Sequence, residues 1–514
     1  MAQEEANQQS LRLAAIDIGS NSIRVVVAQL LPGGDYRVLD DERAATRLAR
    51  ALDATGQLDP QSVEDSISAL RRFRKIAEGM GASKMRAIAT CAVREAENGV
   101  EFVQRARDEA GLNIEVISSL EEAQLAFLSV QRAFDISDKT VLIVDIGGGS
   151  TECVLSSGNH VEQIYHTRLG ALRLSEKYGP GRELFGDDLQ RMMTDIDEEL
   201  GEQVNKPPTY PHLMIGSGGT FTNLASMLIA AKGQTDQHEW GYRVSRAEVR
   251  HLLDRLQKMS INKRRSFPGL SADRAEIIVA GLAVVDRVMR HFKVNLLQVH
   301  TGGVRDGMIL TMIDELQPAS AAPADRRAAV ERFAASCGAD LLHSRQVARL
   351  AGEIFEQLCA PFGLDLRDRE LLESAALLQD VGYLINYDSH HKHSYQLVLN
   401  SRLAGFSRRD LELVANVARY HRGAKPKKKH ENFRRLSDED QQRVRQLVAI
   451  LRVASGLDRS HSQSVENVSI CVEQGKTKLR IASRSDPEVD LWAARRRIKL
   501  FEQTFVTEVI ILPI

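Results

Sequence analysis

The sequence of 514 residues lacks several features that would place it in a specialised class. Its 68 basic and 69 acidic side chains nearly cancel, which argues against general nucleic-acid binding and leaves only local anion sites. The absence of a run of about 18 apolar residues predicts no membrane-spanning helix. The polar start MAQEEANQQSLR is unlike a secretory signal. We therefore expect a cytoplasmic protein without nucleic-acid or membrane partners.

Cysteine is also scarce. The five cysteines form no CxxC pair and show no regular spacing, which excludes a disulfide framework and suits a reducing compartment. Because 43% of the residues are apolar, a sizeable core is possible, and the length allows three or four domains.

What the sequence does contain is an internal repeat. The segment AAIDIGSNSIRVVV (14–27) has an apolar strand ending in an aspartate, a glycine turn with small polar residues, and a Val-rich strand. The segment TVLIVDIGGGSTECVLSSG (140–158) has the same order, about 128 residues later. Two further strands end in glycines, within 213–225 and 296–310. The aligned pairs of the repeat are Asp17 with Asp145, Gly19 with Gly147, and Ser22 with Ser150.

The residue pattern around the repeat predicts an α/β region followed by a helical one. A turn is expected at 32–35, and the segment 316–328, rich in Ala and Pro, reads as a linker. The tail pattern predicts a hairpin at 467–483, one helix at 486–505 and a final strand at 506–514. The predicted strands before the second copy are 11–16, 23–29, 36–39, 85–89 and 114–117, and the helices there are 63–77, 99–110 and 118–134. The expected domains are 1–134, 135–315, 329–460 and 461–514.

Glycine-rich turns after strands let backbone N–H groups converge on an anion, because glycine has no Cβ to block the approach. Neighbouring hydroxyl and amide side chains add donors, and a helix that opens at GSGGT (216–220) adds its positive end. Any one such loop by itself favours an ordinary tight turn, but two matched copies, each with an aspartate at the strand end, favour a phosphate site. The candidate phosphate-binding residues are Gly19, Ser20, Asn21, Ser22, Gly147, Gly148, Gly149, Ser150, Thr151, Gly218 and Gly219.

The acidic residues of these loops are candidate metal ligands. Asp17 and Asp145 are placed to hold a hydrated Mg²⁺ near the phosphates. Alternatively, each aspartate caps an Asx-type turn. Glu152 is expected either to help hold the metal or to order the loop, with a strand-face carboxylate as the alternative.

Four stretches together resemble the exopolyphosphatase/guanosine pentaphosphate phosphohydrolase family of the actin-like ATPase superfamily: DIGSNS (17–22), ATCAVREAENG (89–99), SSLEEAQLAF (118–127) and DIGGGSTE (145–152). The resemblance covers about 11–315. It implies duplicated actin-like (ribonuclease H-like) lobes and hydrolysis of terminal phosphates from inorganic polyphosphate or pppGpp, with a divalent cation. The length and the additional domains match the larger family members and imply a homodimer.

The resemblance also assigns roles to single residues. Glu121 matches the family's catalytic glutamate and would act as general base, whereas the pattern Ser118-x-x-Glu121 by itself favours a capping box. Glu122 would then cap the helix or orient a neighbouring group. Arg94 matches an arginine that contacts the terminal phosphate. Ser119 stands where the family usually has glycine.

The helical region resembles the HD phosphohydrolase fold, whose His and Asp residues bind metal. Its defining pair needs His before Asp, but Gln379 precedes Asp380, so we expect a degenerate domain without catalysis. A residual metal site on His343, Asp380 and Asp458 stays open. The histidines of HHKHS (390–394) are expected in an exposed polar loop.

Two basic runs, 421–435 and 494–499, stand out in a neutral chain. They are either solvated faces or a track for polyphosphate, for which the candidates are Arg422, Lys427, Lys428 and Lys429. The leading hypothesis is a Mg²⁺-assisted exopolyphosphatase, with pppGpp as the alternative substrate. An actin-like-fold kinase and a non-catalytic polyphosphate or alarmone sensor are the competing classes.

Overall fold

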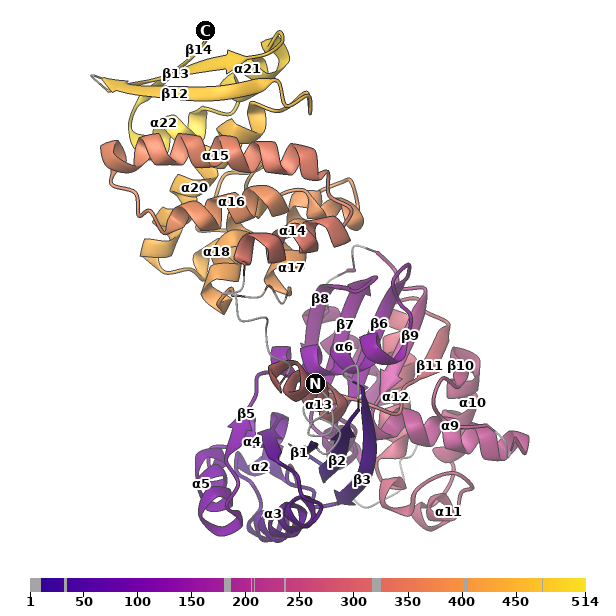
Figure 1. The fold of residues 1–514 in the computed structure, drawn as a ribbon. Coiled ribbons are helices and arrows are strands. Elements are labelled where there is room, and N and C mark those ends of the chain that lie inside the picture. The colour runs from indigo at the N-terminus through magenta and orange to yellow at the C-terminus, as the bar shows by residue number, and fades with distance from the viewer. Residues whose placement is uncertain are drawn as a thin grey trace. The chain divides into compact units, whose positions relative to one another are not determined.

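The computed structural model describes residues 11–31, 35–179, 186–204, 206–207, 209–234, 237–316, 325–401, 403, 405–473 and 475–514. Most of the turn expected at 32–35 and of the linker expected at 316–328 lies outside these ranges. The chain forms two compact units, the first up to residue 319 apart from 160–163, and the second comprising the rest (Figure 1).

The first sheet of the first unit has the strand order β3-β2-β1-β4-β5. Strand β1 pairs antiparallel with β2 and parallel with β4. Antiparallel strands can be joined by a tight turn, and the turn between β1 and β2 is the first glycine loop. The strands are β1 (Arg12–Ile18), β2 (Ile23–Leu30), β3 (Tyr36–Ala44), β4 (Lys84–Ala89) and β5 (Ile114–Val116).

The second sheet repeats this arrangement, with the order β10-β11-β9-β6-β7-β8. Strand β6 pairs antiparallel with β7 and parallel with β9, as β1 does with β2 and β4. Strands β1 and β6 also share one burial pattern along their seven residues. The repeat seen in the sequence is therefore structural. The strands are β6 (Thr140–Ile146), β7 (Thr151–Ser157), β8 (His160–Thr167), β9 (Leu213–Ser217), β10 (Arg243–Ser245) and β11 (Leu296–Val299).

Alternation along β1 places side chains on both faces of the first sheet. Ala14, Ile16 and Ile18 belong to the core with α3 (Pro60–Gly79) and α5 (Gly99–Ala110). Leu13 and Ala15 belong to the opposite core, with α6 (Ser119–Ala133) and α13 (Val304–Leu316). With both faces covered, β1 presents Asp17 and the glycine loop at its carboxyl end.

The remaining helices of the first unit include five that pack in the core of the second sheet, namely α7, α8, α9, α10 and α12. Their bounds, with those of the short helices, are α2 (Leu52–Thr55), α4 (Cys91–Glu95), α7 (Ala171–Tyr178), α8 (Gly186–Gln203), α9 (Gly219–Lys232), α10 (Arg246–Leu256), α11 (Ile261–Arg265), η1 (Ala272–Arg274) and α12 (Ile278–His291).

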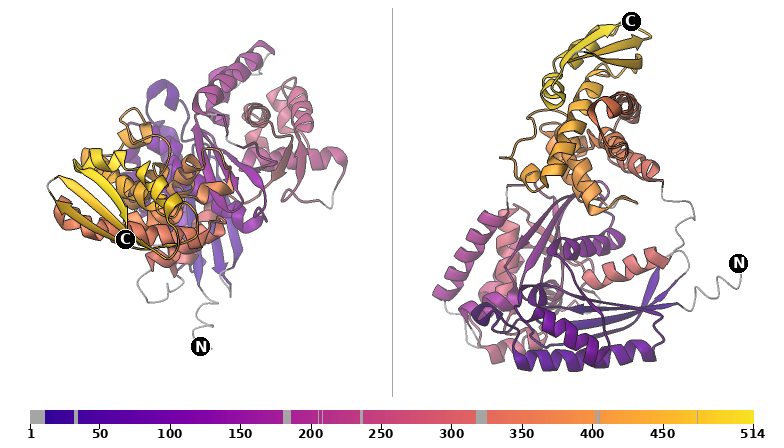
Figure 2. Two further views of the ribbon diagram at one scale, coloured as in Figure 1. Left: turned by 90° about the horizontal axis from the view of Figure 1, so that it is seen from above. Right: turned by 90° about the vertical axis from the view of Figure 1, so that its left-hand side faces the viewer.

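The second unit begins with helices and ends with a small sheet of order β12-β13-β14. The hairpin β12–β13 is antiparallel, and β14 joins β13 in parallel. Figure 2 shows this yellow sheet at one end of the unit. Its elements are α14 (Arg326–Ser336), α15 (Leu341–Phe362), α16 (Asp368–Leu378), η2 (Val381–Leu384), α17 (His390–Leu399), α18 (Arg408–Arg419), α19 (Glu431–Arg434), α20 (Asp438–Gly456), β12 (Val465–Glu473), β13 (Lys476–Ser483), α21 (Glu488–Arg495), α22 (Lys499–Phe505) and β14 (Glu508–Pro513).

The predicted fold class is confirmed, with two corrections in the second unit. The single helix expected at 486–505 is two helices, because a tight turn from Ala494 O to Arg497 N (2.9 Å) forms where Ala494 packs against Gly456. The histidine segment expected as an exposed loop begins α17, and His390 is only 1% exposed. Among the helices within the described ranges, none has both the length and the apolar character needed to span a bilayer.

We predict that Gly307→Ala destabilises the first unit by about 1–3 kcal/mol, because the added methyl group would lie 2.2 Å from the carbonyl oxygen of Leu125, where α13 crosses α6. Gly201→Ala in α8 is the matched control: its methyl group meets nothing within 4 Å, so it should gain about 0.5–1 kcal/mol of helix stability. Urea denaturation measures both. Equal effects of the two variants would show that the crossing does not require glycine.

Candidate functional site

The two glycine loops adopt the same turn. In the first loop the Gly19 N–H donates to the carbonyl of Ser22 across 3.2 Å, and in the second the Gly147 N–H donates to Ser150 across 3.0 Å. Each turn follows the aspartate at the end of its strand. The repeated sequence thus produces a repeated backbone shape.

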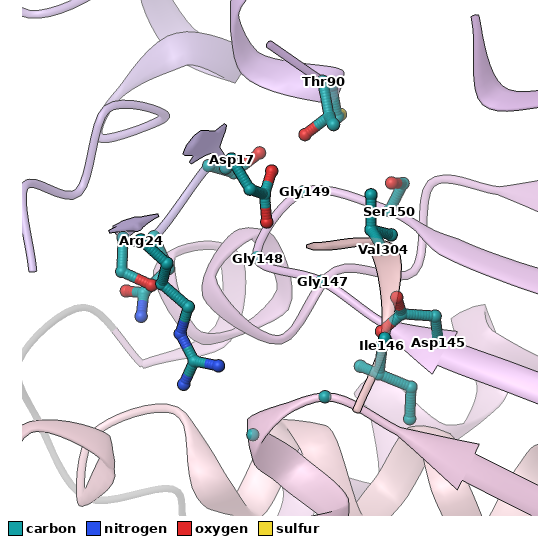
Figure 3. A pocket seen from close by; sticks show the side chains of 18 of the residues that line it. Asp17, Arg24, Thr90, Asp145, Ile146, Gly147, Gly148, Gly149, Ser150 and Val304 are labelled. Carbon is teal, nitrogen blue, oxygen red and sulfur yellow. The ribbon is translucent and has the colours of Figure 1, made fainter. Parts of the chain in front are cut away.

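The two loops also lie against one another. A Cβ on Gly148 would be 3.0 Å from the backbone nitrogen of Asn21, and one on Gly149 would be 2.8 Å from Ser20 Oγ. A side chain at either position would push the first loop away, so glycine allows this close approach. The loops form opposing walls of one pocket, with Asp17, Thr90 and Asp145 around it (Figure 3).

Most of the predicted binding residues line this pocket. Thr151 is an exception, because its hydroxyl is buried and donates to the carbonyl of Leu169 across 2.6 Å. The predicted residues that the pocket brings together are Asp17, Gly19, Ser20, Asn21, Ser22, Asp145, Gly147, Gly148, Gly149, Ser150, Gly218 and Gly219.

The glycines at the start of α9 seat two charged side chains. Gly218 has a φ of 95°, and a Cβ there would lie 2.8 Å from Asp145 Oδ1. A Cβ on Gly219 would lie 1.9 Å from the Arg274 guanidinium. Gly218 and Gly219 therefore leave room at the pocket for the carboxylate of Asp145 and the guanidinium group of Arg274.

The two strand-end aspartates have different neighbours. The residue across from Asp17 is Arg24, whereas the residue across from Asp145 is Glu152. Burial raises the pKa of Asp17, and the charges of Arg305 and Arg24 oppose this rise. Burial, with the charges of Glu152 and Asp17, raises the pKa of Asp145 to about 7. We call the loops at 19–22 and 147–150 the first and second cradles. The strand ends at the second cradle carry two acidic side chains, whereas those at the first carry one acidic and one basic side chain.

The structure places Glu122, not Glu121, at the pocket. Glu121 completes a capping box, in which its Oε2 accepts from the backbone N–H (2.8 Å) and the hydroxyl (2.7 Å) of Ser118; these bonds lower its pKa. Glu122 lines the pocket and is buried, and burial together with the charge of Glu152 raises its pKa well above the ordinary value. Successive helical residues point about 100° apart, so the cap that holds Glu121 turns Glu122 toward the pocket.

Arg94 and Glu152 stand directly behind the pocket. Arg94 Nη1 donates to the carbonyl of Ile117 across 2.8 Å and lies 3.5 Å from Glu122 Oε2. Glu152 is buried, with Oε1 3.0 Å from His166 Nδ1. Neither is among the residues that line the pocket.

Three arginines of the pocket were not predicted. Arg24 lies in β2, Arg274 ends η1, and Arg305 begins α13. Burial and repulsion from Arg305 and Arg43 lower the pKa of Arg24 to about 10, and burial with Arg43 and Arg24 lowers that of Arg274 to about 9. An anion in the pocket would relieve this repulsion. The sequence did contain a signal for two of these arginines, since Arg24 and Arg305 lie shortly after two of the glycine loops.

Cys91 also lines the pocket. Burial and the neighbouring carboxylate of Glu95 raise its pKa to about 12, so it is a neutral packed thiol, not a nucleophile.

The donor set of the pocket suits a hard divalent cation. Its candidate ligands are carboxylates, and burial favours their protonated forms until a positive charge compensates them. In the described part of the chain, however, the oxygens of Asp17, Asp145 and Glu152 are not gathered within 4.8 Å of one another.

The candidate residues of the second unit fall into two groups. His343 Nδ1 lies 2.8 Å from Asp458 Oδ2, and Asp380 lies next to His343, so the residues of the possible metal site do meet. Arg422 lines a separate arginine-rich pocket. Lys427, Lys428 and Lys429 are exposed, and Lys428 Nζ lies 3.3 Å from Asp438 Oδ1.

Comparison with known proteins supplies independent evidence. The model of the Ppx/GppA phosphatase family matches residues 26–316, and that of Ppx/GppA phosphatase, domain III, matches residues 326–493. Exopolyphosphatase 1 of Mycobacterium tuberculosis is 32% identical over 315 residues, which are 59% of this chain and 89% of that protein. Exopolyphosphatase 1 of Mycobacterium leprae is 30% identical over 59% of this chain and 90% of its own length.

Solved structures agree. The Ppx/GppA family member of Aquifex aeolicus has a TM-score of 0.52 at 27% identity, covering 60% of this chain and 99% of that chain. An exopolyphosphatase from Cytophaga hutchinsonii has a TM-score of 0.56 at 25% identity, with the same coverage.

The pKa of Asp145 predicts a pH-dependent effect on stability in the absence of divalent cations. The folded-state value is about 7, against about 4 in an unfolded chain. Between these values the folded state binds more protons, so Asp145 costs stability as pH rises through this window. The stability of Asp145→Asn relative to wild type should therefore increase from about pH 4 to about pH 7.

Urea denaturation in a chelator at several pH values measures this difference. Asp314→Asn, at an exposed position, is the control and should show no such trend. A pH-independent difference for Asp145→Asn would contradict the assignment.

Proposed function

The chain belongs to the Ppx/GppA phosphatase family, and from this premise we propose that it is an exopolyphosphatase, which releases terminal phosphate from inorganic polyphosphate. The observation that carries the proposal is the pocket itself: two glycine cradles face each other across a space that also holds three arginines and buried carboxylates. Backbone N–H groups and guanidinium groups bind phosphate oxygens, while the carboxylates serve a cation and a water molecule.

The cradles bind and orient the substrate in this proposal. The loops at 19–22 and 147–150 hold neighbouring phosphates from opposite sides, and Arg24, Arg274 and Arg305 neutralise their oxygens. Holding the phosphoanhydride in line with a water molecule is most of the catalysis that phosphoryl transfer needs.

We assign the general base to Glu122 in place of Glu121. Its carboxylate is at the pocket, and burial raises its pKa, so it takes a proton from water more readily than an ordinary carboxylate does. Arg94, 3.5 Å from Glu122 Oε2, is a positioning residue that keeps the carboxylate aimed inward.

Asp17 and Asp145, with Glu152 behind them, are the residues that would hold Mg²⁺. The bound ion would neutralise the substrate's charge and favour the ionised forms of these acids. This assignment rests on the oxygen-only donor set and on the burial of the acids.

The alternatives make different predictions in one assay. Polyphosphate and pppGpp present the same terminal phosphoanhydride to the loops, so phosphate release from both, measured side by side with Mg²⁺, decides between the substrates. An actin-like-fold kinase would instead transfer phosphate from ATP to an acceptor, and a sensor would bind without turnover. A homodimer and a cytoplasmic location are proposed from the family resemblance; light scattering of the purified chain tests the first.

We predict that Glu122→Gln lowers kcat for polyphosphate by about 10²–10⁴-fold, the usual contribution of a general base. Substrate binding should persist, because the cradles are untouched. The matched control is Glu121→Gln, which changes the adjacent carboxylate in the same way; glutamine still fits a capping box, so activity should stay near wild type. A large loss in Glu121→Gln with little loss in Glu122→Gln would reverse the assignment.

The basic run gives a second prediction. Reversing Lys427, Lys428 and Lys429 to Glu should raise KM for long polyphosphate more than for tripolyphosphate, since only a long chain reaches beyond the pocket. The effect should shrink as salt is added. Reversing three exposed lysines of the first unit, Lys75, Lys258 and Lys263, is the control. Equal losses at all chain lengths would count against a track.

A further inference from the structure

A second cluster of chemically active side chains lies in the helical part of the second unit. Asp380 follows α16, His390 begins α17, and His421 follows α18. Asp380 Oδ1 is 3.1 Å from His390 Nε2 and 3.6 Å from His421 Nε2. Among the described residues, these three alone bring His, Cys, Asp or Glu ligand atoms within 4.8 Å of one another as a set of three.

The hydrogen bonds of the two imidazoles identify their free nitrogens. His421 Nδ1 lies 2.8 Å from the carbonyl oxygen of Ala418, and His390 Nδ1 lies 3.1 Å from that of Tyr387, while Arg422 Nη1 is farther from the same nitrogen, at 3.5 Å. A carbonyl only accepts, so each Nδ1 carries the hydrogen. Each Nε2 of a neutral ring then carries a lone pair, as in a metal-ligating histidine held by a backbone carbonyl.

For His390, no donor within the described ranges satisfies this lone pair. His390 is 1% exposed, yet its Nε2 has no hydrogen-bond partner, although the Asp380 carboxylate is beside it. A lone pair and a carboxylate oxygen this close repel each other unless a proton or a metal ion lies between them. Ligands about 2.1 Å from one ion lie about 3.0–3.4 Å apart in octahedral or tetrahedral sites. The observed separations of 3.1 and 3.6 Å are close to this range.

An arginine-rich pocket adjoins the cluster and shares His421 with it. The two basic runs of the sequence meet here, since Arg422 comes from one and Arg496 and Arg497 from the other. Burial and the charges of Arg459 and Arg422 lower the pKa of Arg497. As in the glycine-loop pocket, mutually repelling guanidinium groups are stabilised by an anion.

The arginines of this pocket divide into structural and available ones. Arg452 is buried and donates to the carbonyls of Tyr420, Gly423 and Ala424, so its hydrogen bonds are already used. Arg422, Arg459 and Arg496 are exposed.

We propose that Asp380, His390 and His421 bind a divalent transition-metal ion such as Zn²⁺, and that the adjoining arginines hold a phosphate group beside it. Two imidazoles and one carboxylate suit Zn²⁺ and its neighbours, whereas Mg²⁺ prefers oxygen ligands alone. This site is separate from the glycine-loop pocket and goes beyond the proposed function. It also differs from the set expected from the sequence, of which only Asp380 remains a ligand, because Asp458 is engaged by His343.

Zinc titration of the metal-stripped full chain by calorimetry tests the metal site, with excess Mg²⁺ present to occupy oxygen-only sites. Wild type should bind one Zn²⁺, and the variants His390→Ala, His421→Ala and Asp380→Asn should bind it at least about tenfold more weakly. His251→Ala, which removes an exposed imidazole from α10, is the control and should match wild type. X-ray absorption at the zinc edge of the wild-type complex should show two imidazoles.

Absence of zinc binding by wild type, a zinc shell without imidazole, or unchanged affinity in the histidine variants would overturn the metal site. The wild-type measurements decide even if a variant fails to fold.

The phosphate subsite is tested with labelled tripolyphosphate and a labelled nucleoside triphosphate, each bound at equilibrium to the zinc-loaded protein. Wild type is compared with the double variant Arg459→Gln/Arg496→Gln, which leaves the glycine-loop pocket intact. The ligand that uses the subsite should lose affinity in the variant, and this tells a polyphosphate chain from a nucleotide. If neither ligand loses affinity, the phosphate subsite is wrong while the metal site still stands.

Discussion

The close approach of two backbone turns is the constraint on which the rest of this structure depends. The loops at 19–22 and 147–150 touch where Gly148 and Gly149 have no Cβ, and a methyl group there would meet backbone or side-chain atoms of the first loop at 2.8–3.0 Å. Because the contact is made by backbone, its geometry is set by the two sheets that carry the loops. The long buried strands and their covering helices therefore act as the rigid support that catalytic positioning requires.

Charge is the second determinant of the two pockets, because each of them gathers side chains of like charge. Both the glycine-loop pocket and the arginine pocket of the second unit gather guanidinium groups whose pKa values are lowered by burial and by one another. Grouping like charges costs folding free energy, so it persists where binding an anion returns that cost. The same reasoning applies with the opposite sign to the buried acids, which a cation would stabilise.

The sequence predicted the backbone of the site better than its side chains. Glycine and aspartate at strand ends report directly on turns, so the cradles, their pairing and the lobe duplication were predictable. The choice between Glu121 and Glu122 was not, because it depends on how the cap of Ser118 rotates the first turn of α6. Arg274 is distant in the sequence from both glycine loops, and Asp380, His390 and His421 come from the ends of three helices, so only tertiary packing brings these residues to their sites.

Duplication made the two cradles alike in shape, and one cross-strand position made them different in chemistry. The position after the first loop holds Arg24, opposite Asp17, and its counterpart after the second loop holds Glu152, opposite Asp145. Burial raises the pKa of both aspartates, but the charges of Arg305 and Arg24 oppose this rise at Asp17, while Glu152 adds to it at Asp145. A symmetric pocket would bind a phosphate chain equally in either direction. Under the proposed function, this difference at the strand ends would give a phosphoanhydride one preferred direction, with the acidic pair Asp145 and Glu152 on the side where a cation would bind.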